Sequence, residues 1–315
     1  MSAPVEILQL LDYMPATNQR LDSLYTVHRP YEASDPEALI DAVADRVRAV
    51  SVAPPAAARR PLIERLPKLE IIALRAVGTD CVDLDAAAER GIVVTYTPDV
   101  LTDCVADLGM GLVVAISRGI VEGDRYARAG RWPREGDMHL TTSLGGKTLG
   151  IVGLGRIGKA VARRAQAFGM NVAYYGRAKQ DGVGFPYFDD VRALAQASDH
   201  LLLSCPGGPA TRHLVDAEVL AALGPKSFLI NIARGSVVDE AALVEACRNG
   251  VVAGAALDVF EAEPNVPEAL FELENVIVQP HQASATFETR KAMGDLMIDN
   301  MVAHFAGEPV PTPVG

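Results

Sequence analysis

Short runs of valine, isoleucine and leucine alternate with helical patterns along almost the whole chain. This alternation is typical of an α/β protein whose parallel strands are buried on both faces. A long helix is expected over residues 102–129, because Thr102 and Asp103 can cap its start and Gly130 follows its end. In the first hundred residues we expect strands at 6–10, 48–53, 71–75 and 92–96, separated by helices at 36–44, 58–66 and 84–90.

A second alternating series follows, with strands expected at 148–152, 171–175, 200–204, 227–231, 252–257 and 276–279. Six strands, the first followed by a glycine-rich turn, match a dinucleotide-binding domain. The last expected helix, 284–307, has no strand after it and should pack on the first domain. The pattern therefore predicts two Rossmann-like domains with parallel sheets. An NAD(P)-binding domain (100–284) is inserted in a discontinuous, flavodoxin-like substrate-binding domain (1–99 and 285–315).

The composition and net charge of the chain limit the kinds of molecule that it is expected to bind. Of the 315 residues, 49% are apolar and 22% charged, and the net charge of −11 disfavours nucleic-acid binding but permits an anionic substrate at a local arginine cluster. No apolar run approaches the ~20 residues that span a bilayer. The cysteines lack metal-ligand spacing, so we expect reduced thiols, no metal site and a cytoplasmic location: Cys81, Cys104, Cys205 and Cys247.

The candidate cofactor motif is Gly153-Leu154-Gly155-Arg156-Ile157-Gly158, placed between a predicted strand and a predicted helix. In this setting Gly153 permits a tight turn, Gly155 lets the backbone approach a pyrophosphate, and Gly158 allows close helix–strand packing. The helix amino terminus supplies free N–H groups to the phosphates. A tight glycine turn can also form with no ligand, and the strand–turn–helix context favours the cofactor.

The end of the next strand indicates which dinucleotide binds. NAD sites usually carry an acid there, whereas this chain has Gly176-Arg177-Ala178-Lys179 and no acid before Asp181. A guanidinium can pair with a 2′-phosphate, so NADP(H) is favoured over NAD(H). The alternative is that Arg177 and Lys179 are solvated loop cations.

Three later segments place a polar residue at the carboxyl end of a predicted strand, where ligands bind in open α/β sheets. These residues are Arg234 in Asn231-Ile232-Ala233-Arg234-Gly235, Glu263 in Asp258-Val259-Phe260-Glu261-Ala262-Glu263-Pro264, and His281 in Gln279-Pro280-His281-Gln282-Ala283.

With these motifs the chain resembles the D-isomer-specific 2-hydroxyacid dehydrogenases over nearly its whole length. Val77-Gly78-Thr79-Asp80, Thr97-Pro98-Asp99-Val100 and Val105-Ala106-Asp107-Leu108 also carry the resemblance. Within the family it looks most like glyoxylate/hydroxypyruvate and hydroxyphenylpyruvate reductases. The resemblance implies an active site in the cleft between two domains, and a homodimer.

The resemblance also assigns roles. Arg234 is similar to the arginine that binds the carboxylate and keto oxygen of the substrate, and His281 to the general acid that protonates the developing alkoxide. Glu263 is similar to the carboxylate that orients this imidazole. The backbone N–H groups of Val77 and Gly78 resemble a cradle for the substrate carboxylate.

Further positions follow from the resemblance alone. Trp132 matches a residue that in relatives reaches toward the partner subunit's active site, and Asp258 a position near the nicotinamide amide. The remaining cofactor-binding positions implied are Arg156, Ile157, Cys205, Pro206, Thr211, Ile232, Ala233 and Ala283. Gln282 and Ala283 depart from the usual family motif, which leaves the nicotinamide side open. Arg75 can be a second substrate cation or an interdomain ion-pair residue.

The leading hypothesis is therefore an NADP-dependent reductase of a small 2-keto acid such as glyoxylate or hydroxypyruvate. Two alternatives stay open. One is an NAD-dependent dehydrogenase for a bulkier acid, such as phosphoglycerate or hydroxyphenylpyruvate. The other is a cofactor-sensing adaptor protein, against which Arg234, Glu263 and His281 argue.

Overall fold

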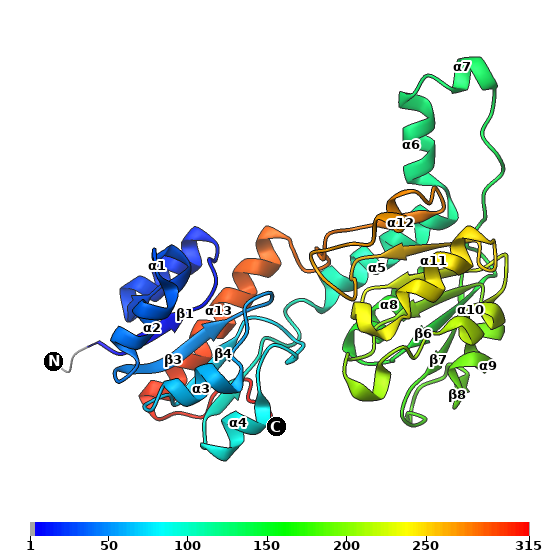
Figure 1. Ribbon diagram of the computed structural model, residues 1–315. Helices are drawn as coiled ribbons and strands as arrows, with labels where there is room; N and C mark the ends of the chain where they lie inside the picture. Colours follow the sequence, from blue (N-terminus) through cyan, green and yellow to red (C-terminus); the bar gives the residue numbers. More distant parts are fainter. Residues whose placement is uncertain (1–3, 315) are drawn as a thin grey trace. The chain divides into compact units, whose positions relative to one another are not determined.

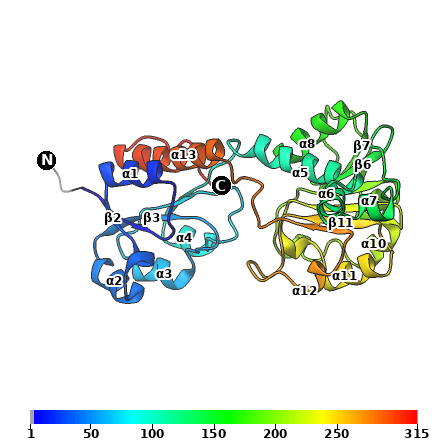
Figure 2. The ribbon, with the colours of Figure 1, turned by 90° about the horizontal axis from the view of Figure 1, so that it is seen from above.

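The computed structural model describes residues 4–314, so residues 1–3 and 315 of the expected substrate domain lie outside the described part. The chain divides into two compact units. Unit 1 comprises Met1–Leu101 and Ser284–Gly315, and unit 2 comprises Thr102–Ala283. Each unit holds one sheet of parallel strands with helices on both faces, as Figures 1 and 2 show for each unit by itself. The predicted α/β class with two parallel sheets is confirmed.

Unit 1 has a five-stranded sheet in the order β2-β1-β3-β4-β5. Its strands are β1 (Glu6–Gln9), β2 (Thr26–His28), β3 (Val47–Val52), β4 (Ile71–Leu74) and β5 (Val93–Thr95). Helices α1 (Pro15–Leu24) and α13 (Phe287–Ala306) cover one face through a shared apolar cluster. Helices α2 (Pro36–Val43), α3 (Arg60–Arg65) and α4 (Leu84–Glu89), with a short 3-10 turn at Pro30–Glu32, lie on the other. The last helix of the chain thus completes the first unit.

Unit 2 has a seven-stranded sheet in the order β12-β11-β10-β9-β6-β7-β8. The strand order reverses around β6, and this is where dinucleotides bind in doubly wound folds. The strands are β6 (Thr148–Val152), β7 (Asn171–Tyr175), β8 (Tyr187–Phe188), β9 (His200–Leu203), β10 (Phe228–Asn231), β11 (Gly254–Leu257) and β12 (Val276–Val278).

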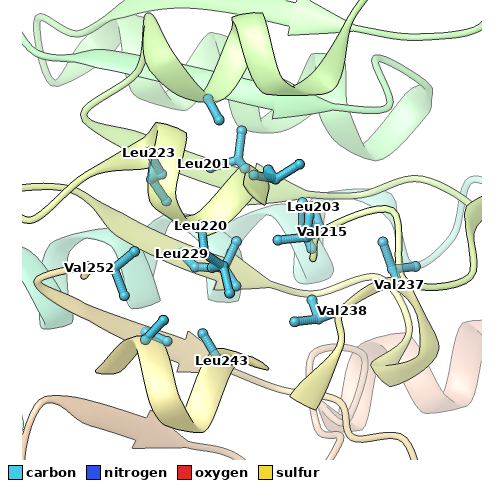
Figure 3. Close-up of a cluster of buried hydrophobic side chains, with 14 of the residues drawn as sticks. Leu201, Leu203, Val215, Leu220, Leu223, Leu229, Val237, Val238, Leu243 and Val252 are labelled. Atoms are coloured by element: carbon cyan, nitrogen blue, oxygen red, sulfur yellow. The ribbon is translucent and has the colours of Figure 1, made fainter. Parts of the chain in front are cut away.

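Helices cover both faces of this second sheet. Figure 2 shows α5 (Thr102–Ser117) and α8 (Arg156–Ala167) on one face and α10 (Ala217–Leu223) and α11 (Glu240–Arg248) on the other. A buried cluster between the sheet and α10 and α11 is drawn in Figure 3. The remaining helices are α6 (Ile120–Arg128), α7 (Trp132–Glu135), α9 (Val191–Gln196) and α12 (Glu268–Phe271), with 3-10 turns at Pro209–Thr211 and Gly235–Val237.

The expected single helix over 102–129 is wrong. Gly119 adopts a left-handed conformation with φ of 56°, which ends α5 and starts α6 at an angle of 58°. Helix α6 and the short α7 then project from the rest of unit 2 as an arm (Figure 1). In the described part of the chain no single helix is long and apolar enough to cross a membrane, and α5 and α6 meet that test only as a bent pair.

Candidate active site

The glycine turn joins β6 to α8 at the centre of the unit 2 sheet. Gly153 has φ of 95°, and a Cβ there would lie 2.7 Å from the backbone of Cys205. A Cβ on Gly158 would lie 2.3 Å from the carbonyl oxygen of Gly153, whereas a Cβ on Gly155 would meet nothing within 4 Å. Two glycines are therefore required by packing, and the third faces open space.

The same turn fits a pyrophosphate electrostatically. Helix α8 begins at Gly155 without a side-chain cap, so its first N–H groups are not bonded to a capping side chain. A helix amino terminus in this state attracts anions. The open space at Gly155 and the uncapped helix start are the two features that a dinucleotide phosphate needs.

The basic loop after β7 is held against the glycine turn. The Gln180 side-chain amide donates to the Leu154 carbonyl at 2.8 Å, and the Gln180 backbone N–H donates to the Tyr174 hydroxyl at 2.8 Å. Arg177 and Lys179 within this loop are exposed. Sequence reasoning missed Gln180, because only the folded chain shows that it connects the loop to the turn.

Glu263 and His281 form a hydrogen-bonded pair in unit 2. The His281 Nδ1 to Glu263 Oε2 distance is 2.6 Å, and the second oxygen, Oε1, accepts the Phe260 backbone N–H at 2.9 Å. Burial alone would raise the pKa of Glu263. The bonds from His281 and Phe260 and the charge of nearby Arg234 outweigh it, so the Glu263 pKa lies below its ordinary value. The carboxylate is therefore ionised beside the imidazole.

The backbone around His281 is fixed by Asp258. Its two carboxylate oxygens accept the N–H groups of Gln282 at 2.8 Å and of Ala283 at 3.0 Å. His281 itself has φ of 50°, which is uncommon for a residue other than glycine. Asp258 is buried, and burial raises its pKa above the ordinary value despite the two N–H donors. The resemblance placed Asp258 near the nicotinamide, and the structure shows it holding the histidine loop.

Arg234 lies in a turn that packs against the Glu263 segment. Asn231 accepts the Ala233 N–H and donates to the Arg234 carbonyl, both at 3.0 Å, and the Arg234 Nη1 donates to the Ala233 carbonyl at 2.7 Å. A Cβ on Gly235 would lie 1.8 Å from the Phe260 carbonyl carbon. Arg234 is half-buried, and its charge acts on Glu263. The three predicted segments thus meet at the carboxyl ends of β10, β11 and β12.

A second His–Glu pair supports the same loop. His213 Nε2 bonds to Glu261 Oε1, and the Glu261 N–H donates to Glu240 at 2.8 Å. Sequence reasoning treated His213 as an ordinary surface or core residue. Its partner is 48 residues away along the chain, so only the fold reveals the pair.

The other implied cofactor positions lie around the glycine turn and the strand ends of unit 2. Cys205 packs on Gly153, and burial raises the pKa of its thiol to about 11, so it is a poor nucleophile. Thr211 donates to the Pro206 carbonyl at 2.8 Å. Ile232, Ala233 and Ala283 are buried, whereas Arg156 is exposed and Ile157 is partly exposed.

Val77 and Gly78 belong to unit 1, in the loop after β4. The loop is fixed by Thr97, whose N–H and hydroxyl both donate to the Ala76 carbonyl, at 2.9 and 3.3 Å. In the described part of the chain, neither Val77 nor Gly78 donates its backbone N–H to a hydrogen bond. These two donors are available to an anion.

Trp132 lies on the arm, at the start of α7. Its side chain is 62% exposed, and its indole N–H donates to Asp137 at 3.1 Å. A cavity of about 470 Å³ lies at the base of the arm, at the amino ends of β10 and β12, and is therefore on the edge of the sheet opposite to Glu263 and His281. No group of three or more metal-ligating side chains occurs among residues 4–314.

Comparison with known proteins gives consistent matches. Residues 110–283 match the model of the D-isomer specific 2-hydroxyacid dehydrogenase, NAD binding domain. The chain is 47% identical over 310 residues to hydroxyphenylpyruvate reductase from Plectranthus scutellarioides, covering 98% of this chain and 99% of the relative. It is 46% identical over 310 residues to glyoxylate/hydroxypyruvate reductase A from Arabidopsis thaliana, with the same coverage.

A solved structure is similar over nearly the whole length. It is the NADPH-dependent glyoxylate/hydroxypyruvate reductase from Sinorhizobium meliloti in complex with NADP and malonate. The TM-score is 0.92 at 44% identity, with 99% of this chain and 97% of that chain covered.

Proposed function

The chain belongs to the D-isomer-specific 2-hydroxyacid dehydrogenase family, and from this membership we propose that it reduces a small 2-keto acid, such as glyoxylate or hydroxypyruvate, with NADPH. The observation that carries the proposal is the 2.6 Å bond between His281 and an ionised Glu263, with the charge of Arg234 beside them. Relatives named for glyoxylate, hydroxypyruvate and hydroxyphenylpyruvate support the substrate class.

In this mechanism Arg234 binds the substrate carboxylate and keto oxygen with its planar fork. Nδ1 of His281 is held by Glu263, which leaves Nε2 to donate a proton to the keto oxygen as it becomes an alkoxide. Glu263 orients this imidazole, and its negative charge lies beside the proton-donating ring. The bound nicotinamide supplies the hydride. From unit 1, the N–H groups of Val77 and Gly78 hold the substrate carboxylate.

The preference for NADPH rests on the loop after β7. Arg177 and Lys179 are exposed cations next to the glycine turn, and Gln180 ties their loop to that turn. Gly176 begins this loop, and its carbonyl accepts the Tyr187 hydroxyl at 3.2 Å. A guanidinium at this place pairs with a 2′-phosphate and has no equivalent partner in NADH.

The arm supports the homodimer proposal. Trp132 at the start of α7, which is 62% exposed, and Leu140 in the segment that follows α7, which is 98% exposed, are large apolar residues left open to solvent in the single chain. We assign them to contacts with a second copy, with Trp132 reaching the partner's substrate. The scattered cysteines, which lack metal-ligand spacing, support a cytoplasmic location.

The deciding experiment is a panel of 2-keto acids assayed with NADPH and with NADH. We expect turnover of glyoxylate and hydroxypyruvate with a preference for NADPH. A preference for NADH with hydroxyphenylpyruvate would favour the alternative dehydrogenase for a bulkier acid. No turnover of any acid with either nucleotide would refute the proposed function and favour the adaptor alternative.

A further inference from the structure

Arg75 of unit 1 is a buried cation without a counter-charge. Its backbone N–H donates to the Val52 carbonyl at 2.8 Å, so it continues the ladder at the carboxyl end of β4. Its side chain is only 9% exposed, and the guanidinium carbon lies 4.7 Å from the Tyr13 ring centroid. Among residues 4–314, no carboxylate lies within ion-pair distance of Arg75, and its buried Nε has no hydrogen-bond partner. Buried arginines are normally paired, so this one needs another explanation.

The surroundings of Arg75 change from apolar to polar along one face of the sheet. Side chains alternate between faces along a strand, so Arg75 shares a face with Ile71 and Ala73. Ile71 and Ala73 belong to the apolar cluster under α1 and α13. At the carboxyl end of the same face the row in register with Ala73 contains Ser51 and Thr95.

Three further buried polar atoms of unit 1 have no hydrogen-bond partner of good geometry among the described residues: the hydroxyls of Tyr13, Ser51 and Thr95, of which the first two lie close enough to influence each other. Apolar residues of the same shape would avoid the cost of leaving such groups unsatisfied. The polar end of this face is therefore not explained by packing within unit 1.

Arg75 also lies close to the expected carboxylate cradle. Val77 is two residues further along the chain, so its Cα is within about 7 Å of the Arg75 Cα. Burial lowers the pKa of Arg75, and the charge of Arg290 lowers it further. A bound anion would offset both the burial of the guanidinium and its repulsion by Arg290. The Arg75 backbone thus lies close along the chain to the two N–H donors of the expected cradle.

We propose that Arg75 is a second anion-binding group of the substrate site, which binds a carboxylate or phosphate at the end of the keto acid remote from its reacting carbonyl. The Tyr13 ring holds the guanidinium in place. This inference rests on the proposed function and extends its substrate class from small acids with one anionic group to 2-keto acids with two. Glyoxylate has a single anionic group and gains nothing from Arg75.

The test compares oxaloacetate, 3-phosphohydroxypyruvate and glyoxylate in the full-length protein at saturating NADPH. In Arg75→Met we expect KM for at least one of the two-anion acids to rise at least about tenfold, as for loss of a charge-assisted hydrogen bond. KM for glyoxylate should change less than about twofold, by the same reasoning. Arg75→Lys should recover part of the loss. A rise in KM for oxaloacetate alone would show that Arg75 binds a carboxylate, and a rise for 3-phosphohydroxypyruvate alone would show that it binds a phosphate.

Arg48→Met is the matched control. Arg48 is also a unit 1 arginine over an aromatic ring, 4.9 Å from the Phe305 centroid, but it is paired with Glu70 at 2.5 Å. This substitution should leave all three KM values unchanged. Because Arg75→Met removes an unpaired buried charge, its Tm should equal or exceed that of the wild type.

The inference is overturned if Arg75→Met raises KM equally for all three acids, or for none. It is also overturned if the wild type reduces glyoxylate but neither two-anion acid. If no keto acid is reduced at all, the proposed function is refuted. The anion-binding role of Arg75 is then tested by the change in Tm that a ligand causes. Malonate, but not acetate, should then raise the Tm of the wild type and not that of Arg75→Met. Equal shifts in the two proteins would refute the subsite.

Discussion

Replacing Glu263 by Gln tests whether the carboxylate supplies charge or only orientation to His281. The amide oxygen of Gln can still accept the Nδ1 proton, so the geometry is retained while the negative charge is lost. The 2.6 Å distance is that of a charge-assisted hydrogen bond. Such bonds contribute about 1.5–3 kcal/mol. Since the two side chains are 41% and 33% exposed, solvent screening places this one at the lower end, about 1.5 kcal/mol.

That energy predicts a pH-dependent defect. Loss of about 1.5 kcal/mol corresponds to a fall of roughly tenfold in kcat/KM. The pKa of Glu263 is lowered, so the wild type loses this negative charge only when the pH falls below that value, and there Glu263→Gln should reduce glyoxylate nearly as fast as the wild type. At higher pH, where Glu263 is ionised in the wild type, kcat/KM of the variant should be about one tenth of the wild-type value.

The assay is the pH profile of kcat/KM for keto-acid reduction, with Glu261→Gln as the control. Glu261 is paired with His213 in the neighbouring His–Glu pair, so its replacement removes an equivalent charge without touching His281. The control should keep the wild-type profile. An equal loss in Glu263→Gln at every pH would mean that Glu263 acts through orientation alone, and no loss would remove it from the mechanism.

Three further outcomes are expected. Gly235→Ala should destabilise the fold by about 3 kcal/mol or more, because the new Cβ would meet the Phe260 backbone at 1.8 Å. Urea unfolding will show this, with Gly111→Ala in helix α5 as the control: nothing lies within 4 Å of the new Cβ, and the substitution should stabilise the fold by up to about 1 kcal/mol. Arg177→Asp should raise the ratio of the KM for NADPH to the KM for NADH at least about tenfold. An unchanged ratio would exclude a contact between Arg177 and the 2′-phosphate. Burial lowers the pKa of His200 to about 4, so the folded state resists protonation that the unfolded chain accepts below about 6.5. The free energy of unfolding should therefore fall by up to about 3 kcal/mol as the pH is lowered from about 6.5 to about 4. In His200→Gln this pH-dependent fall should be absent when unfolding is measured at several pH values.

Most of the sheet architecture could be predicted from sequence because central parallel strands are buried on both faces and appear as apolar runs. The expected strands at 148–152 and 171–175 match β6 and β7 to the residue. The strands that were missed, β2 and β8, have three and two residues and lie at the edges of their sheets. Edge strands are buried on fewer sides, so their composition carries little signal.

Helices were harder to predict from the sequence where their apolar face is small. Helix α1 buries only Thr17 and Leu21, so its sequence has no clear helical period. The break between α5 and α6 depends on the left-handed conformation of Gly119, which a glycine permits but does not require. Propensity alone could not distinguish one long helix from two.

For the site, position at a strand end was the informative signal. Glu263 and His281 are 18 residues apart in sequence and were singled out because their strands end at the same edge of a sheet. What could not be predicted is how these residues are held. Asp258, Gln180 and the His213–Glu261 pair act through contacts made only after the chain folds. Such contacts leave no local pattern in the sequence.

Both units carry energetically unfavourable features at the carboxyl edge of their sheets. In unit 2 the carboxyl end of the sheet holds His281 at positive φ and Asp258 buried with a raised pKa. In unit 1 the carboxyl end of β4 holds Arg75 without a counter-charge. Each feature lowers the stability of its own unit, and an apolar replacement of similar volume would cost less. Unfavourable features that collect at the carboxyl edge of both sheets fit the proposed roles in binding and catalysis, because selection for stability alone would remove them.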